Sequence, residues 1–121
     1  MMPELITTKI SRERLKEHLE TGFGDMIKFV VDIDKEIIAI GGEMHADCEE
    51  LLLRQGSLEE NLWGANIYPY ENASERFEYS SLINIRPSQN NRNMIIQDKN
   101  ICDRVHAIAV RLLLGNDDYL S

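Results

Sequence analysis

Hydrophobic residues recur at helical spacing in three parts of the chain, and each part predicts a helix. Leu15 and Leu19 lie one turn apart among charged residues, and Ser11 before them is a favourable N-cap. Asp47 stands where it can cap a second, shorter helix. The clearest pattern comes last, where apolar residues line one face of residues 101–113 and either Asp98 or Asn100 can serve as the N-cap.

Apolar and polar residues alternate in other parts of the chain, which is typical of strands. Residues 27–33 alternate most clearly. Residues 36–40 follow as a strand that is apolar on both faces and therefore belongs in the centre of a sheet. Further strands are predicted at residues 62–68 and 77–86, and residues 94–97 can add a short fifth strand.

The predicted order of elements is α-β-β-α-β-β-(β)-α. Short connections between successive strands favour antiparallel pairing. We therefore expect an α+β fold in which helices pack on one face of a mostly antiparallel sheet of four to five strands. The other face would keep apolar residues such as Val30 and Leu82, which favours a homodimer.

Length and composition fit one globular domain. The chain has 121 residues, 43% of them hydrophobic and 28% charged, which is enough to bury a single core. We expect one domain over residues 1–121, with an ordered core over about residues 8–115. Cys48 and Cys102 both fall in apolar helical patterns and are expected to be reduced, buried thiols.

The sequence carries no signal for a membrane or for export. No stretch approaches the roughly 20 apolar residues of a membrane span, and residues 1–14 lack the apolar core of a secretory signal, so a cytoplasmic location is expected. The net charge of −8 disfavours nucleic acid and anionic membrane surfaces as partners. The expected partner is therefore a small polar ligand or another protein.

The run GGEMHAD, residues 41–47, gathers side chains that could bind a metal ion. If the run stays extended, Glu43, His45 and Asp47 point the same way, and their carboxylate and imidazole groups suit a divalent metal. The structural alternative is that Asp47 caps the following helix, Glu43 favours the positive end of that helix, and His45 packs. A third interpretation gives Glu43 and His45 a binding or acid–base role without a metal.

The segment INIRPSQNNRN, residues 83–93, contains two arginines, several amide and hydroxyl side chains and no acid. A guanidinium can hold a carboxylate or phosphate with two parallel hydrogen bonds, so Arg86 and Arg92 could form an anion-binding cradle. Alternatively, the Asn and Ser residues form turns and the arginines pair with acidic side chains (Glu43, Glu59 or Glu60). No P-loop motif is present.

The run LWGANIYPY, residues 62–70, places Trp63 and two tyrosines near a flexible glycine. Such aromatic residues can wall a pocket or a partner surface, or belong to the core. Asn66 falls on the strand face opposite Trp63 and points either to solvent or to a site.

Three strings of this chain, GGEMHAD, GSLEENLWGANIYP and SLINIRPSQNNRNMIIQD, occur in that order. Together they resemble a family of small prokaryotic single-domain proteins of unknown function. The resemblance covers roughly residues 10–115. It implies a soluble bacterial or archaeal protein, but it assigns no activity and no catalytic residue.

We expect a binding module for a small polar or anionic ligand or for a protein partner, and we expect no cofactor. The side chains predicted to form one binding patch are Glu43, His45, Trp63, Asn66, Arg86 and Arg92. One alternative is a metal-assisted hydrolase that uses Glu43, His45 and Asp47 as ligands. A second alternative is a structural or regulatory homodimer without a ligand.

Overall fold

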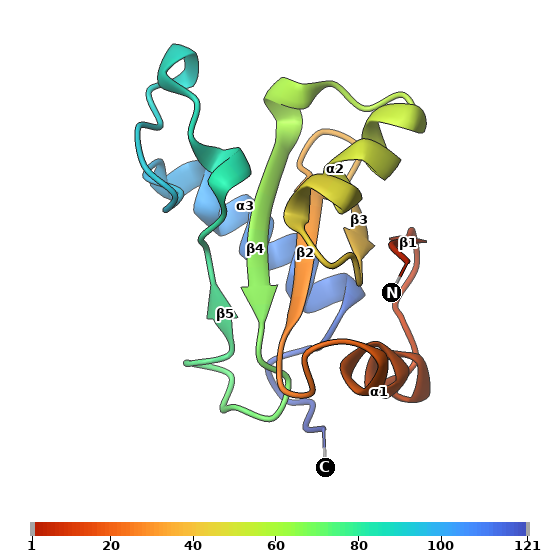
Figure 1. Ribbon diagram of the computed structural model, residues 1–121. Helices are drawn as coiled ribbons and strands as arrows, with labels where there is room; N and C mark the ends of the chain where they lie inside the picture. Colours follow the sequence, from red (N-terminus) through yellow and green to blue (C-terminus); the bar gives the residue numbers. More distant parts are fainter. Residues whose placement is uncertain (1, 121) are drawn as a thin grey trace.

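The computed structural model describes residues 2–120, which form a five-stranded antiparallel sheet with three α-helices packed against it (Figure 1). The sheet order is β1-β3-β2-β4-β5, with strands β1 (Glu4–Ile6), β2 (Ile27–Asp32), β3 (Ile37–Ile40), β4 (Leu62–Ile67) and β5 (Phe77–Glu78). The helices are α1 (Arg12–Thr21), α2 (His45–Arg54) and α3 (Lys99–Leu112), with short 3₁₀ turns η1 (Glu59–Asn61), η2 (Leu82–Asn84) and η3 (Pro87–Gln89). The predicted α+β class and antiparallel sheet are confirmed.

The helices cover both faces of the sheet, whereas the sequence predicted that they pack on one face. Phe29 and Val30 are neighbours in β2, point to opposite faces, and are both fully buried. α1 and α3 pack on the Phe29 side, and α2 packs on the Val30 side, in front of the sheet in Figure 1. A strand that is apolar on both faces needs a cover on each. Because Val30 lies under α2, it provides no open apolar face for a homodimer.

β1 is an edge strand that was not predicted, because three residues are too few to show a periodic pattern. It pairs with β3, with Leu5 opposite Ala39. The Glu4 carboxylate accepts hydrogen bonds from Arg14 Nε at 2.7 Å and from His18 Nε2 at 2.8 Å. These bonds tie the strand to α1, ahead of the point where the ordered core was expected to begin.

The strand predicted at residues 77–86 is wrong beyond Glu78. β5 contains only Phe77 and Glu78, and the chain then coils through η2 and η3. The short fifth strand predicted at residues 94–97 is reduced to one isolated bridge, between Ile95 and Ser80. The apolar and polar residues alternate here as in a strand, but side chains satisfy the backbone in place of a strand ladder.

The Asn84 side chain stands in for a neighbouring strand beside β4. Its Oδ1 accepts a hydrogen bond from Gly64 N at 2.8 Å, while its Nδ2 donates to Gly64 O at 2.9 Å and to Met94 O at 3.0 Å. Asn91, which is also buried, donates from Nδ2 to Asn84 O at 2.8 Å. These two amides fix residues 79–97, called here the 79–97 segment, against the sheet.

The predicted helix caps are confirmed for α1 and α3. Ser11 and Asp98 each accept hydrogen bonds from backbone N–H groups in the first turn of their helix. The second helix differs, because α2 begins at His45 and Asp47 lies inside its first turn, where the carboxylate accepts a hydrogen bond from Met44 N at 2.9 Å. Within residues 2–120, no helix is long and apolar enough to cross a membrane.

Both cysteines are free thiols, and they differ in burial. Cys48 lies on the buried face of α2, against the sheet, and this burial raises the pKa of the thiol to about 11. Cys102 is only half-buried in α3, which is more exposed than predicted. A thiol with a raised pKa is a poor nucleophile and metal ligand, so Cys48 serves the core.

Replacing Asn84 with Asp should destabilise the fold, because a carboxylate cannot donate to the carbonyl oxygens of Gly64 and Met94. We expect the free energy of unfolding, measured in urea, to fall by about 2–4 kcal/mol. Asn72→Asp makes the same change at an exposed position and should alter stability by less than about 0.5 kcal/mol. Equal losses in both variants would contradict the role assigned to Asn84.

Candidate functional site

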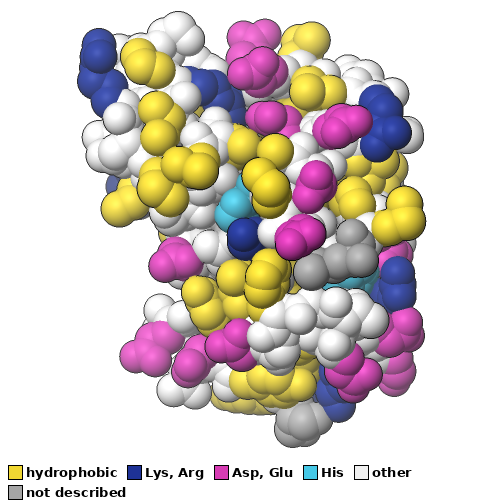
Figure 2. Space-filling view, in the orientation of Figure 1, with side chains coloured by type: hydrophobic (Ala, Val, Ile, Leu, Met, Phe, Trp, Pro, Cys, Tyr) yellow, Lys and Arg dark blue, Asp and Glu magenta, His cyan; other side chains and the backbone are white. Residues whose placement is uncertain are grey.

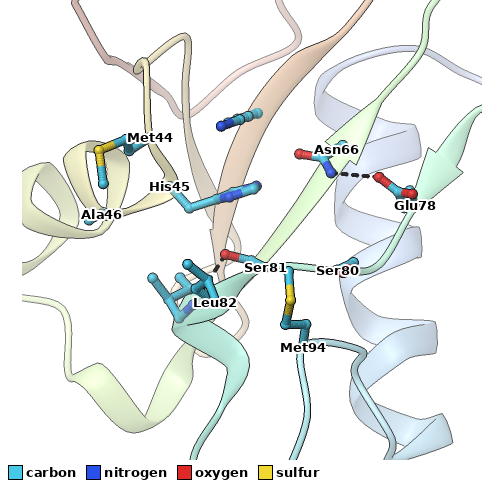
Figure 3. A pocket seen from close by; sticks show the side chains of 11 residues that line it. Met44, His45, Ala46, Asn66, Glu78, Ser80, Ser81, Leu82 and Met94 are labelled. Atoms are coloured by element: carbon cyan, nitrogen blue, oxygen red, sulfur yellow. Dashed lines mark hydrogen bonds between the residues drawn. The ribbon is translucent and has the colours of Figure 1, made fainter.

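A cavity of about 420 Å³ opens on the face of the sheet that α2 covers only in part (Figure 3). Its floor is a row of polar side chains on neighbouring strands, because Lys28 lies opposite Asn66 and Asn66 lies opposite Glu78. The start of α2 forms one wall and the 79–97 segment forms the other. The wall residues are Met44, His45 and Ala46 on the first side and Ser80, Ser81, Leu82, Ile83 and Met94 on the second.

Gly64 allows the two walls to approach the floor. A Cβ at this position would lie 2.7 Å from the Cβ of Ser81 and 3.2 Å from Cδ2 of His45. The first distance is shorter than real side-chain contacts, so a larger residue would push Ser81 away from the sheet. The glycine that the sequence analysis treated as flexible is therefore needed for close packing.

His45 is held in one protonation state at the edge of the cavity. Its Nε2 lies 2.8 Å from the backbone oxygen of Ala65, and because a carbonyl only accepts, Nε2 carries the proton. Burial lowers the pKa of the His45 imidazole, and the nearby Lys28 ammonium lowers it further. The bond to Ala65, the Asn66 side chain and the Glu78 carboxylate oppose the shift. The ring is therefore neutral near physiological pH.

Asn66 places an unpaired polar atom in the cavity floor. Its side chain is 8% exposed, and Nδ2 donates to Glu78 Oε1 at 2.8 Å. Its Oδ1 is buried and has no hydrogen-bond partner of normal geometry in residues 2–120, although the Asn66 side chain lies near enough to His45 to raise the pKa of that ring. Figure 3 shows this oxygen on the side of the amide that faces His45, away from Glu78. Leaving such an oxygen unpaired costs about 1–3 kcal/mol, so a partner at this point is favoured.

Lys28 brings a positive charge to the same floor. Its ammonium lies 5.1 Å from the centre of the Phe23 ring, a cation–π contact at the protein surface. No carboxylate in the described part of the chain lies within ion-pair distance of it. Lys28 falls in the alternating strand predicted at residues 27–33 and was not singled out from the sequence. The only signal that could have singled it out was its place beside Asn66 across the sheet.

The metal site considered for Glu43, His45 and Asp47 does not form. The helix begins at His45, so the extended geometry that would align the three side chains is absent. Asp47 accepts the bond from Met44 N, His45 Nε2 faces Ala65, and Glu43 is exposed outside the cavity. In residues 2–120, no three His, Cys, Asp or Glu side chains are grouped so that they could hold a metal ion.

Arg86 has a structural environment and does not line the cavity. The side chain is 7% exposed and lies over the ring of the buried Trp63, with its guanidinium carbon 4.4 Å from the ring centre. Its guanidinium donates to backbone oxygens: from Nη1 to Glu59 at 2.7 Å, from Nε to Ile83 at 3.1 Å, and from Nη2 to Leu62. The guanidinium therefore links η1, β4 and η2 at a point called here the joint, and the hydrogen-bond donors used there cannot serve a ligand.

The structure therefore separates the six side chains predicted to form one patch. His45 and Asn66 line the cavity together. Arg92 is exposed and lies outside the residues that line the cavity, as does Glu43. The cavity gains Lys28 and Glu78, which the sequence did not single out.

Arg86→Ala should destabilise the protein, because backbone oxygens at the joint lose charged donors while remaining buried. We expect the free energy of unfolding to fall by about 3–5 kcal/mol. Arg92→Ala removes the same charge from the surface and should change stability by less than about 0.5 kcal/mol. An Arg86 variant as stable as the Arg92 variant would show that the joint does not need the guanidinium.

His45 should titrate below its ordinary pKa of 6.5, because the folded protein disfavours the charged ring. The unfolded chain then binds more protons than the folded one in this range. The contribution of His45 to stability is therefore complete above pH 6.5 and is lost as pH falls toward the folded-state pKa. NMR of the His45 ring gives the midpoint directly, and a value above 6.5 would contradict the assignment.

Comparison with known proteins gives a family and no function. Neither curated proteins nor solved structures include a match to this chain. A family model described as "Protein of unknown function (DUF5674)" matches residues 4–112, which include every strand and helix described above. The chain belongs to the DUF5674 family.

Proposed function

We propose that this protein binds a small molecule with an anionic group in the cavity between α2 and the 79–97 segment. The observation that carries the proposal is the Lys28 ammonium, which lines the cavity without a carboxylate partner in the described residues. A cation that borders a cavity and has no carboxylate within ion-pair distance attracts an anion from solution.

The start of α2 adds to this attraction. His45 and Ala46 are the first residues of the helix and line the cavity wall. The N-terminal end of a helix carries a partial positive charge, and its first N–H groups point away from the helix body. Because the Asp47 carboxylate in the same turn already offsets part of this charge, the helix end adds less than Lys28 to the attraction of an anion.

The rest of the cavity suits an apolar body. Its volume lies within the range of roughly 300–1,000 Å³ that small-molecule sites occupy. Met44, Leu82 and Met94 line it and are exposed, with Leu82 at 70%. Figure 2 shows hydrophobic side chains around a histidine and a basic side chain on this face of the molecule. A ligand that covers these residues would remove apolar surface from water.

The polar side chains of the walls favour binding over catalysis. Ser81 is buried, and its Oγ accepts a hydrogen bond from Ile83 N at 3.3 Å. The proton-bearing nitrogen of His45 is engaged with Ala65. Neither contact places a nucleophile next to a base, which acyl transfer and hydrolysis through a covalent intermediate would need.

The proposal predicts that a small branched carboxylate, 4-methylpentanoate, binds the wild-type chain and raises its melting temperature at millimolar concentration, against sodium chloride at equal ionic strength. Lys28→Met keeps most of the apolar stem and removes the charge, so it should weaken binding about tenfold or more. Arg92→Ala loses the same charge outside the cavity and should leave the affinity unchanged.

Two outcomes would overturn the proposal. One is a wild-type chain that takes up no carboxylate, either in the thermal assay or by NMR shift changes at His45 and Asn66. The other is an equal loss of affinity in the Lys28 and Arg92 variants, which would trace the effect to overall charge.

A further inference from the structure

We infer that the ligand is a zwitterionic α-amino acid with an apolar side chain. This inference rests on the proposed function, because it specifies the molecule whose anionic group Lys28 would hold. It goes further by assigning a second, positively charged group of the ligand to the opposite side of the cavity floor.

The orientation of the Asn66 amide is the first step. A carboxylate accepts hydrogen bonds only, so the Asn66 atom 2.8 Å from Glu78 Oε1 must be the NH₂ group. The amide oxygen then occupies the other position, where it is buried without a partner in residues 2–120 and faces the side of His45 (Figure 3). An amide oxygen only accepts, so the ligand group that meets it must donate an N–H or O–H.

The charge of Glu78 selects the kind of donor. Its Oε1 holds the Asn66 amide, and the Tyr68 hydroxyl lies 3.5 Å away. No basic side chain in the described part of the chain lies within ion-pair distance of this carboxylate, although it borders the cavity. A positively charged donor beside Asn66 would form a hydrogen bond to the amide oxygen and would be attracted by the Glu78 carboxylate. An ammonium group meets this requirement.

The order of the side chains across the sheet determines how the charged groups of the ligand are oriented. Lys28, Asn66 and Glu78 sit opposite one another on adjacent strands, so the charges run positive, neutral, negative. Directly opposed side chains on neighbouring strands have Cβ atoms about 4.5–5.5 Å apart. The flexible stem of Lys28 lets its ammonium approach a carboxylate beside the amide. Carboxylate and ammonium groups on one carbon atom match this order.

The third substituent of that carbon would meet the apolar walls. Met44 and Met94 flank the cavity from opposite sides, and Leu82 lies beside them. Methionine side chains adapt to apolar groups of different shapes. A second carboxylate in this substituent would lie against the apolar walls and lose its hydration. A ligand without an amine would leave Asn66 Oδ1 unpaired. Acidic amino acids and simple fatty acids should therefore bind less well.

Calorimetric or NMR titration of the full chain with four probes tests the inference. L-Leucine carries both charged groups, 4-methylpentanoate lacks the amine, isopentylamine lacks the carboxylate, and L-glutamate adds a second carboxylate. We expect L-leucine to bind at least about tenfold more tightly than each of the other three. Binding of 4-methylpentanoate as tightly as L-leucine would overturn the inference and leave the proposed anion site intact. If no carboxylate probe binds, both the inferred amino-acid ligand and the proposed anion site are overturned.

A variant that removes the charge of Glu78 but keeps its hydrogen bond to Asn66 gives a second test. Glu78→Gln retains an oxygen that can accept from Asn66 Nδ2 and removes only the negative charge. It should weaken the binding of L-leucine about tenfold and leave the binding of 4-methylpentanoate unchanged or slightly tighter. Glu43→Gln makes the same substitution outside the cavity and should affect neither probe. A Glu78 variant that binds L-leucine as well as the wild type would contradict the assigned ammonium position.

Discussion

The pair of hydrogen bonds between the Asn84 amide and the backbone of Gly64 determines what the α2 face of the sheet looks like. α2 has ten residues and packs mainly over β2 and β3, so it leaves the side of the sheet toward β5 uncovered. Asn84 holds the 79–97 segment against that side. Since the segment and the helix approach from different directions, their surfaces do not close completely over the floor between them. The cavity is the space that remains.

The polar character of that space follows from its position. Along β2 and β4, the residues under α2 are Val30 and Leu62, which lose contact with water and are apolar. Farther along the same strands, the cover ends and the residues become Lys28 and Asn66. A charge beside a cavity keeps access to water, whereas a charge under α2 would need a buried partner. The change from apolar to polar residues along one face therefore marks the boundary between core and candidate site.

Sequence patterns predicted the elements whose stability depends on burying one stripe or face. α1, α3, β2, β3 and β4 were predicted within a few residues, and Ser11 and Asp98 cap as expected. The 79–97 segment could not be predicted in this way. Its alternation is that of a strand, but its backbone is satisfied by amides such as Asn84 and Asn91, and such tertiary hydrogen bonds leave no periodic signal.

The candidate site was predicted only in part for the same reason. His45 and Asn66 were identified from local strings, and they do meet in the cavity. Arg86 was expected to bind an anion, yet the backbone oxygens of Glu59 and Leu62 use its donors. Lys28 had no unusual neighbours in the sequence, since what distinguishes it is the register of β2 against β4. Strand register depends on contacts between distant residues, which a single sequence does not reveal.

The amide of Asn84 also has a consequence for how this molecule meets other copies of itself in a crowded solution. An unpaired strand edge is a template on which foreign chains can add and grow into aggregates. Here the outer strands β1 and β5 have three and two residues. Where the pairing of β4 with β5 ends, the Asn84 side chain already bonds both backbone groups of Gly64 in β4. The sheet therefore offers little exposed backbone on which another strand could nucleate, and the group that shapes the cavity also shields the fold against edge-to-edge polymerisation.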